Sequence, residues 1–220
     1  MNERRENESS GIEFQPGAPQ SSPVQVANGE FARFFEVLAD PAWFGSWAGQ
    51  VVRQSTPRWI SRPYRLTGAG ALLTGARWNV KRLMPAIYAS TDPVTLNAEL
   101  FYKGAQYGWT EADFNPLLMV GMHWKLQSVV DLTSPTLLHA FRVSRHSLEI
   151  CHWENAQLAG VEPVTQAIAR AAFERMAEGL IVPSARRKGG INIVFFPSHR
   201  RDGSVIQPLR EDEVPFMHGL

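Results

Sequence analysis

The chain has 220 residues, of which 44% are hydrophobic and 20% charged, and its formal net charge is +1. A chain of this length can bury one sizeable core without needing a second domain. The nearly balanced charge produces no global field that would attract nucleic acid or a membrane surface. We therefore expect a soluble globular protein that does not bind nucleic acid directly.

The cysteine and histidine content argues against disulfides and metals. Cys151 is the only cysteine, so neither an intramolecular disulfide nor a cysteine-based zinc cluster can form within one chain. The six histidines show no convincing metal-ligand spacing. Cys151 beside His152 could be a nucleophile, but a partly buried structural cysteine is the favoured interpretation. We expect no metal and a reducing compartment.

Residues 1–27 are rich in polar residues and proline and poor in large aliphatic residues. Such a segment cannot bury enough surface to offset the entropy of ordering. We predict a disordered tail over residues 1–27 and a single domain over residues 28–220. The N-terminus lacks the apolar stretch of a signal peptide, and no later run is apolar enough to span a bilayer. A cytoplasmic location is therefore expected, with export by a system that uses no cleaved signal as the alternative.

The first half of the domain alternates short helical and strand patterns. Phe31, Phe34, Phe35 and Leu38 recur at helical spacing, and Asp40-Pro41 ends that helix. Aromatic residues cluster at 43–47, and short strands are expected at 51–52, 77–79 and 86–88, separated by a glycine-containing loop through Gly68 and Gly70. Asp92 suits an N-cap and Pro93 a first helical position, so a helix should run through Glu99 to Tyr102.

The second half of the domain also alternates helical and strand patterns. Residues 126–132 resemble a strand and residues 136–141 a helix, and Pro163 opens a further helix that Gly179 would end as a C-terminal cap. Strands are expected at 180–182 and 191–196, joined by a basic turn at 186–190. That turn could contact phosphate or simply be solvated. Because the strands do not alternate regularly with helices, an α+β fold is favoured over a doubly wound one.

Signatures of several common enzyme classes are absent from the sequence. It contains no GxGxxG after a strand, no GxxxxGK[ST], no HExxH and no GxSxG. Dehydrogenases with a dinucleotide fold, P-loop NTPases, zinc proteases and serine hydrolases of the α/β type therefore lose their main support.

Several blocks in the right order resemble the RES-domain family, which is named for its arginine, glutamate and serine. The blocks are GARWN at 75–79, AIYAS at 86–90, AE at 98–99, TQA at 165–167, GLIVPSAR at 179–186, and then Asn192, Pro197 and His199. The chain departs from the family pattern at Ala76, where a second glycine is usual, at 80–84, where a glycine turn is usual, and at Phe196, where asparagine is usual.

The resemblance implies a fold, an activity and a partner. RES proteins are typically toxins of toxin–antitoxin pairs that deplete NAD by hydrolysis or phosphorolysis, and their fold is similar to ADP-ribosyltransferase toxins. We therefore expect an ADP-ribosyltransferase-like α+β fold, with small twisted antiparallel or mixed sheets that form a cleft. NAD would be the substrate, inorganic phosphate a candidate co-substrate, and a helix-turn-helix antitoxin the partner; a homodimer is left open.

The family's functional residues map onto this chain by matching position. Arg77, Glu99 and Ser184 would be the catalytic arginine, glutamate and serine, and Tyr88 would be the aromatic residue of the cleft. Asn79 is a further candidate for binding NAD.

The family also carries an arginine on its first strand. Arg53 fits that position best, and Arg65 competes with it.

These residue types suit cleavage of a glycosidic bond to a cationic ring. An arginine fork can bind phosphate oxygens, a tyrosine can stack on nicotinamide, and a carboxylate can stabilise an oxocarbenium-like ribose. Ser184 could orient nicotinamide or phosphate. Each residue also has a plain structural interpretation: a surface ion pair for Arg77 and Glu99, a core position for Tyr88, and a turn for Ser184.

Three functions therefore remain open on the sequence: an NAD hydrolase or phosphorylase toxin, a protein mono-ADP-ribosyltransferase of the same fold, and a non-catalytic binding module. The enzymatic interpretations require that Arg77, Tyr88, Glu99 and Ser184 line one concave pocket large enough for a dinucleotide, because these residues lie far apart in the sequence. The third interpretation gives no reason for them to meet.

Overall fold

A computed structural model describes residues 27–55, 66–106, 108, 110 and 118–209. Except for Ala27, the predicted tail at residues 1–27 lies outside the described residues, as does Arg65. The strands are β1 (Phe44–Ser55), β2 (Ile87–Ser90), β3 (Leu118–Asp131), β4 (Gly179–Pro183), β5 (Ile191–Phe195) and β6 (Val205–Pro208). The α-helices are α1 (Phe31–Val37), α3 (Ala69–Thr74), α4 (Pro93–Gln106), α5 (Pro135–Ala140), α6 (Arg145–Glu149), α7 (Trp153–Leu158) and α8 (Val164–Glu174).

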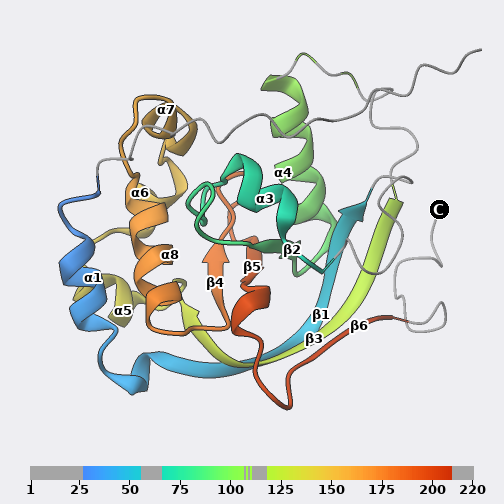
Figure 1. Cartoon of the computed structure of the whole chain (residues 1–220). Helices are drawn as coiled ribbons and strands as arrows, with labels where there is room; N and C mark the ends of the chain where they lie inside the picture. Colours follow the sequence, from blue (N-terminus) through green and yellow to red (C-terminus); the bar gives the residue numbers. More distant parts are fainter. Residues whose placement is uncertain (1–26, 56–65, 107, 109, 111–117, 210–220) are drawn as a thin grey trace, which may run out of the picture.

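The strands form one mixed sheet that closes on itself. Their order is β1-β2-β5-β4-β3-β6, and β1 also pairs with β3, so five strands make a closed barrel and β6 extends the edge of β3. The pairing of β3 with β4 is parallel, whereas the other pairings are antiparallel. Figure 1 shows β1 and β3 running together as a long curved pair of strands. The helices on the left of this view are α1, α5, α6, α7 and α8, whereas the upper ends of β1 and β3 lie on the right. The fold is thus a mixed α+β fold, as predicted.

The core follows the two-residue alternation of the strands. On β5, Ile193 and Phe195 contribute to one buried cluster, whereas Val194 and the following Phe196 contribute to the other. One cluster lies among the strand residues, and the other includes buried residues of α1, α5, α6 and α8. Because successive strand side chains point to opposite faces, Tyr88 on β2 packs toward the helical cluster. This is the side on which the candidate site lies.

Helix α4 begins where the sequence predicted. The Asp92 carboxylate accepts the backbone N–H of Thr95 at 2.9 Å, and Pro93 is the first residue of the helix. A side-chain acceptor satisfies N–H groups that have no partner in the first turn. The helices predicted around residues 31–38, 136–141 and after Pro163 are also present.

Three local predictions were wrong. The segment through Gly68 and Gly70, predicted as a loop, contains helix α3, with Gly68 as its N-cap and Gly70 inside it. Residues 77–79 do not form a strand: Ala76 and Asn79 exchange backbone hydrogen bonds of 3.2 Å, so the chain makes a tight turn there. Gly179 does not cap α8, because that helix ends at Glu174 and Met176 adopts the left-handed conformation at φ 61°. Gly179 is instead the first residue of β4.

Gly179 is required by close backbone packing. A Cβ added there would lie 2.3 Å from the carbonyl oxygen of Val194 on β5. That oxygen belongs to the backbone of β5, so it cannot move away without distorting the strand. We expect Gly179→Ala to lower the free energy of unfolding by about 1–3 kcal/mol, as overpacking does elsewhere. Urea unfolding measures this loss. Gly45→Ala is the matched control, since nothing lies within 4 Å of its added Cβ; equal stability losses for both variants would contradict the packing explanation.

The described residues include no helix that is long and apolar enough to cross a membrane.

Candidate active site

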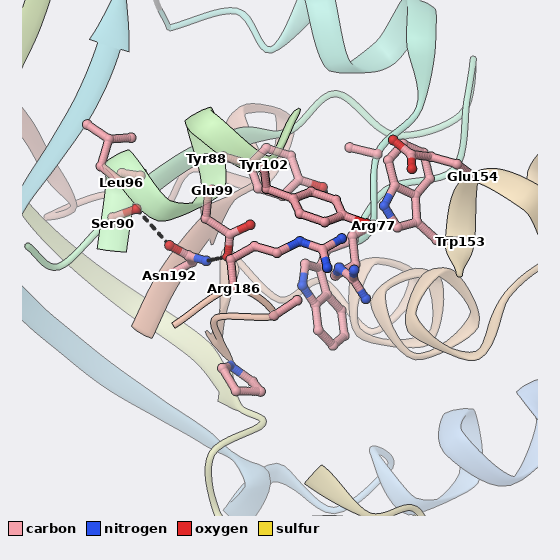
Figure 2. A pocket seen from close by; sticks show the side chains of 15 residues that line it. Arg77, Tyr88, Ser90, Leu96, Glu99, Tyr102, Trp153, Glu154, Arg186 and Asn192 are labelled. Atoms are coloured by element: carbon pink, nitrogen blue, oxygen red, sulfur yellow. Dashed lines mark hydrogen bonds between the residues drawn. The ribbon is translucent and has the colours of Figure 1, made fainter. Parts of the chain in front are cut away.

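A cavity of about 320 Å³ opens between β2, α4, the turn at 76–79, α7 and the segment after β4. Three of the predicted site residues line it: Arg77, Tyr88 and Glu99. Figure 2 shows these side chains converging with those of Ser90, Tyr102, Trp153, Glu154, Arg186 and Asn192. Residues more than a hundred positions apart in the sequence thus meet in one concave site.

Glu99 is held firmly at one of its two carboxylate oxygens. Its Oε1 accepts a hydrogen bond from the Ser184 hydroxyl at 2.6 Å and another from Asn192 Nδ2 at 3.0 Å. Asn192 is in turn oriented by Ser90, whose hydroxyl donates to Asn192 Oδ1 at 2.7 Å (Figure 2). Among the described residues no group donates to Oε2 of Glu99, so this oxygen is available to a ligand.

Ser184 is buried behind Glu99 and is not among the residues that line the cavity. Its hydroxyl donates to Glu99 and accepts the backbone N–H groups of Arg186 and Arg187, each at 3.1 Å. A serine hydroxyl has one donor and two acceptor positions, and protein groups use all three here. Ser184 therefore acts on the site by fixing Glu99 and the turn after β4, whereas the sequence suggested direct contact with a ligand.

Arg77 projects from the tight turn at 76–79 and is hydrogen-bonded to α6 and to the connection between α6 and α7. Its Nη1 donates to the carbonyl oxygens of Leu148 at 2.9 Å and Cys151 at 3.0 Å. Burial lowers the pKa of Arg77, and the nearby Arg186 cation adds to this effect, against the opposing influence of Cys151 and Glu99. An arginine still remains charged at neutral pH, so the cavity contains a rigidly held, partly desolvated cation.

Tyr88 is fixed through its hydroxyl. The hydroxyl donates to Asn79 Oδ1 at 2.9 Å and accepts the backbone N–H of Trp78 at 3.0 Å. Burial raises the pKa of Tyr88 well above its ordinary value, so the phenol stays neutral. With its polar end tied to the 76–79 turn, the ring serves as an apolar wall of the cavity.

Two other predicted ligand-binding residues, Asn79 and Arg53, are not among the residues that line the cavity. Asn79 is fully buried, and its Nδ2 donates to the carbonyl oxygens of Ala71 and Met84. It supports Tyr88 from behind. Arg53 on β1 donates from Nε to the Tyr88 carbonyl oxygen at 2.9 Å. Since Arg65 is outside the described residues, the choice between Arg53 and Arg65 stays a prediction.

The basic turn after β4 divides into three different environments. Arg186 lines the cavity, with its guanidinium carbon 3.1 Å from the centre of the Tyr102 ring. Arg187 pairs with Asp92 at 2.8 Å, and Lys188 is exposed. Burial acts to raise the pKa of Asp92, but hydrogen bonds from Thr95 and the Arg187 charge outweigh it, so that pKa is lowered.

The lining residues that sequence reasoning missed include Ser90, Tyr102, Trp153 and Glu154. Ser90 lies two residues after Tyr88 on the same strand, and Tyr102 lies three residues after Glu99 on the same helix, so both spacings place them on the faces already chosen. Trp153 and Glu154 begin the short helix α7, which no pattern in the sequence indicated. They close the cavity opposite Glu99 (Figure 2).

The arrangement places two cations, one clamped carboxylate and aromatic walls around a single cavity. It can bind an anionic group at the arginines and stabilise positive charge near Glu99. In the part of the chain that the structure describes, no group of three or more His, Cys, Asp or Glu side chains is placed to hold a metal ion.

Comparisons with known proteins identify the family of the chain. Residues 50–217 match the RES domain. Proteins of Mycobacterium bovis and Mycobacterium tuberculosis named NAD(+) phosphorylase MbcT are 28% identical over 163 residues, which cover 67% of this chain and 78% of theirs. The crystal structure of the M. tuberculosis MbcT–MbcA toxin–antitoxin complex matches with a TM-score of 0.63 and 19% identity, over 83% of this chain and 91% of that one.

The domain match spans most of the chain and includes Arg77, Glu99 and Ser184. The protein therefore belongs to the RES-domain family.

Proposed function

We propose that this protein cleaves the nicotinamide–ribose bond of NAD. The observation that carries the proposal is the convergence of Arg77, Tyr88 and Glu99, from three separate segments, on one cavity in which Ser184 and Asn192 fix the carboxylate. The naming of the mycobacterial relatives as NAD(+) phosphorylases supports NAD as the substrate.

The clamped carboxylate suits the charge that develops in this reaction. When the C1′–N bond breaks, its electron pair passes to the pyridinium nitrogen, neutral nicotinamide leaves, and the ribose carbon becomes positively charged. Glu99 would stabilise that charge through Oε2 while its donors hold Oε1, so little reorganisation is needed during the reaction. No covalent nucleophile is required.

The remaining residues would bind and orient NAD. Arg77 offers Nη2 and Nε to phosphate oxygens while Nη1 stays anchored to the backbone. The Tyr88 ring would stack on nicotinamide. A volume of about 320 Å³ is at the lower end for small-molecule sites. We infer that it encloses the nicotinamide–ribose end and that the rest of NAD extends along the surface.

Phosphate is the acceptor that the relatives' name favours. An oxygen of phosphate would attack C1′ as the bond to nicotinamide breaks, and the products would be nicotinamide and ADP-ribose 1″-phosphate. With water as acceptor the products would be nicotinamide, ADP-ribose and one proton. Transfer of ADP-ribose to a protein side chain is the alternative within the same fold.

Chromatography of the products distinguishes these acceptors. The purified protein is incubated with NAD that is labelled in its ADP-ribose part. The three conditions are buffer alone, buffer with inorganic phosphate, and a cell lysate depleted of nucleotides. We expect ADP-ribose 1″-phosphate to form when phosphate is present. Free ADP-ribose in both buffer conditions would identify a hydrolase, and label retained on lysate proteins would identify a protein ADP-ribosyltransferase. Intact NAD in all conditions would overturn the proposal in favour of a non-catalytic binding module.

The ADP-ribosyltransferase-like fold belongs to this proposal too. Its support is the mixed α+β architecture, in which the cavity lies beside a barrel strand and is covered by α4 and α7.

A separate antitoxin, of the helix-turn-helix type, is the proposed partner. Its support is the likeness in fold to a toxin that was crystallised with its antitoxin. Expression of the protein alone should lower cellular NAD and stop growth, and co-expression of the antitoxin should restore both. Harmless expression of catalytically active protein, with cellular NAD unchanged, would contradict the toxin role.

A further inference from the structure

A second, smaller cavity of about 70 Å³ adjoins the candidate active site. It is lined by Cys151, His152 and Asn155, together with five residues that also line the larger cavity: Arg77, Tyr102, Trp153, Glu154 and Arg186. The two arginines therefore stand where the two cavities meet. Figure 2 shows their guanidinium groups beside each other, between Glu99 and Trp153.

Neither arginine is neutralised by a direct ion pair in the described part of the chain. Arg77 is held by backbone carbonyl oxygens, and Arg186 is held by the face of the Tyr102 ring. Both anchors are uncharged, so they fix the geometry without cancelling the charge. The two guanidinium groups line the same small cavity, and burial together with the Arg186 charge lowers the pKa of Arg77. Two like charges placed this close repel each other. An anion between them would offset that repulsion.

We propose that the junction between Arg77 and Arg186 is a phosphate-binding subsite, with Arg186 as the second arm of a two-arginine clamp. The inference rests on the proposed function and adds a residue and a ligand class to it. Two planar guanidinium groups suit the tetrahedral oxygens of a phosphate, to which each can donate two parallel hydrogen bonds. The phosphate group has two possible sources, namely free inorganic phosphate and the diphosphate of NAD.

Glu154 makes the proposal more specific. It lines both cavities, and its carboxylate would repel a phosphate bound at the junction. Removing this charge should therefore tighten the binding of phosphate, whereas removing Arg186 should weaken it. A residue cluster with a purely structural role would not show these opposite effects.

Calorimetric titration of inorganic phosphate and of ADP-ribose tests the clamp without any turnover. The proteins are the wild type, Arg186→Gln, Arg186→Lys, Glu154→Gln and Lys188→Gln, at a constant low ionic strength that limits screening. Lys188→Gln is the matched control, because it removes one positive charge from the same turn at an exposed position. We expect Arg186→Gln to weaken binding of at least one probe about tenfold or more, the loss typical of a charge-assisted hydrogen bond.

Glu154→Gln should bind the same probe several-fold more tightly, and Lys188→Gln should bind it like the wild type. If phosphate binding is weakened while ADP-ribose binding is unchanged, the subsite holds free phosphate. If ADP-ribose binding is weakened, it holds the diphosphate of NAD. Arg186→Lys, which keeps the charge, should lose less affinity than Arg186→Gln.

Equal affinities of the wild type and Arg186→Gln for both probes would overturn the subsite, as would failure of the wild type to bind either probe. Because binding is measured without catalysis, a protein that binds phosphate through Arg186 but releases no nicotinamide would contradict the proposed function and leave the subsite standing. If Arg186→Gln changed neither the release of nicotinamide nor the affinity for either probe, the subsite would be contradicted and the proposed function would stand.

Discussion

Glu99→Gln is expected to reduce kcat for NAD cleavage by about a thousandfold, the loss found when a group that stabilises transition-state charge is removed. The substitution preserves the volume of the side chain. It also preserves an oxygen that can accept the hydrogen bonds from Ser184 and Asn192, so the amide should adopt the same position. What disappears is the negative charge at the atom that faces the ligand. The effect should therefore fall on kcat, with a much smaller change in KM.

The measurement is the steady-state rate of nicotinamide release at saturating NAD, together with thermal unfolding to confirm the fold. Glu174→Gln provides a control, since Glu174 forms an exposed ion pair with Arg170 on α8 and such pairs contribute little to stability. If folded Glu99→Gln turned over NAD at the wild-type rate, Glu99 would not be the residue that stabilises the cation.

Arg77→Lys is expected to lower kcat/KM for NAD by about a hundredfold, equivalent to about 2.7 kcal/mol. Lysine keeps the positive charge, but its single ammonium cannot bond the Leu148 and Cys151 carbonyl oxygens and at the same time present a planar pair of donors to a phosphate. The loss thus reports the geometry of the guanidinium rather than its charge.

Initial rates at low NAD concentration measure this loss directly. Arg145→Lys is the matched control, because Arg145 is more than one-third exposed and pairs with Glu149 on the surface of α6. Full activity of Arg77→Lys would show that only a positive charge is needed at this position. Equal losses in Arg77→Lys and Arg145→Lys would show that the effect is not specific to the cavity.

Local sequence rules were sufficient to predict the helix that carries Glu99 and the strand that carries Tyr88. Asp92 and Pro93 defined the start of α4 and therefore the position of Glu99, because side-chain capping and the fixed φ of proline act within one turn. The largely apolar run at 191–196 predicted β5; that Ile193 and Val194 belong to different buried clusters is seen only in the structure. The resemblance to the RES family then supplied the combination of Arg77, Glu99 and Ser184.

The remaining features depend on contacts between distant segments. Arg77 is anchored by carbonyl oxygens at 148 and 151, and no property of the 75–79 block indicates that. Gly179 resembled a helix cap, but its place is decided by the carbonyl oxygen of Val194 on the neighbouring strand. Trp153 and Glu154 lie on a six-residue helix that is too short to show periodicity, and isolated helices of that length depend on tertiary packing.

The most direct test of bond cleavage at this site is the amount of nicotinamide that the purified protein releases for each NAD consumed. Cleavage of the nicotinamide–ribose bond predicts one nicotinamide per NAD, with no nicotinamide mononucleotide or AMP among the products, and it predicts that Glu99→Gln loses both signals together. Consumption of NAD with formation of nicotinamide mononucleotide and AMP would instead place the reaction at the diphosphate, and NAD that stays intact with the folded wild-type protein would contradict cleavage altogether.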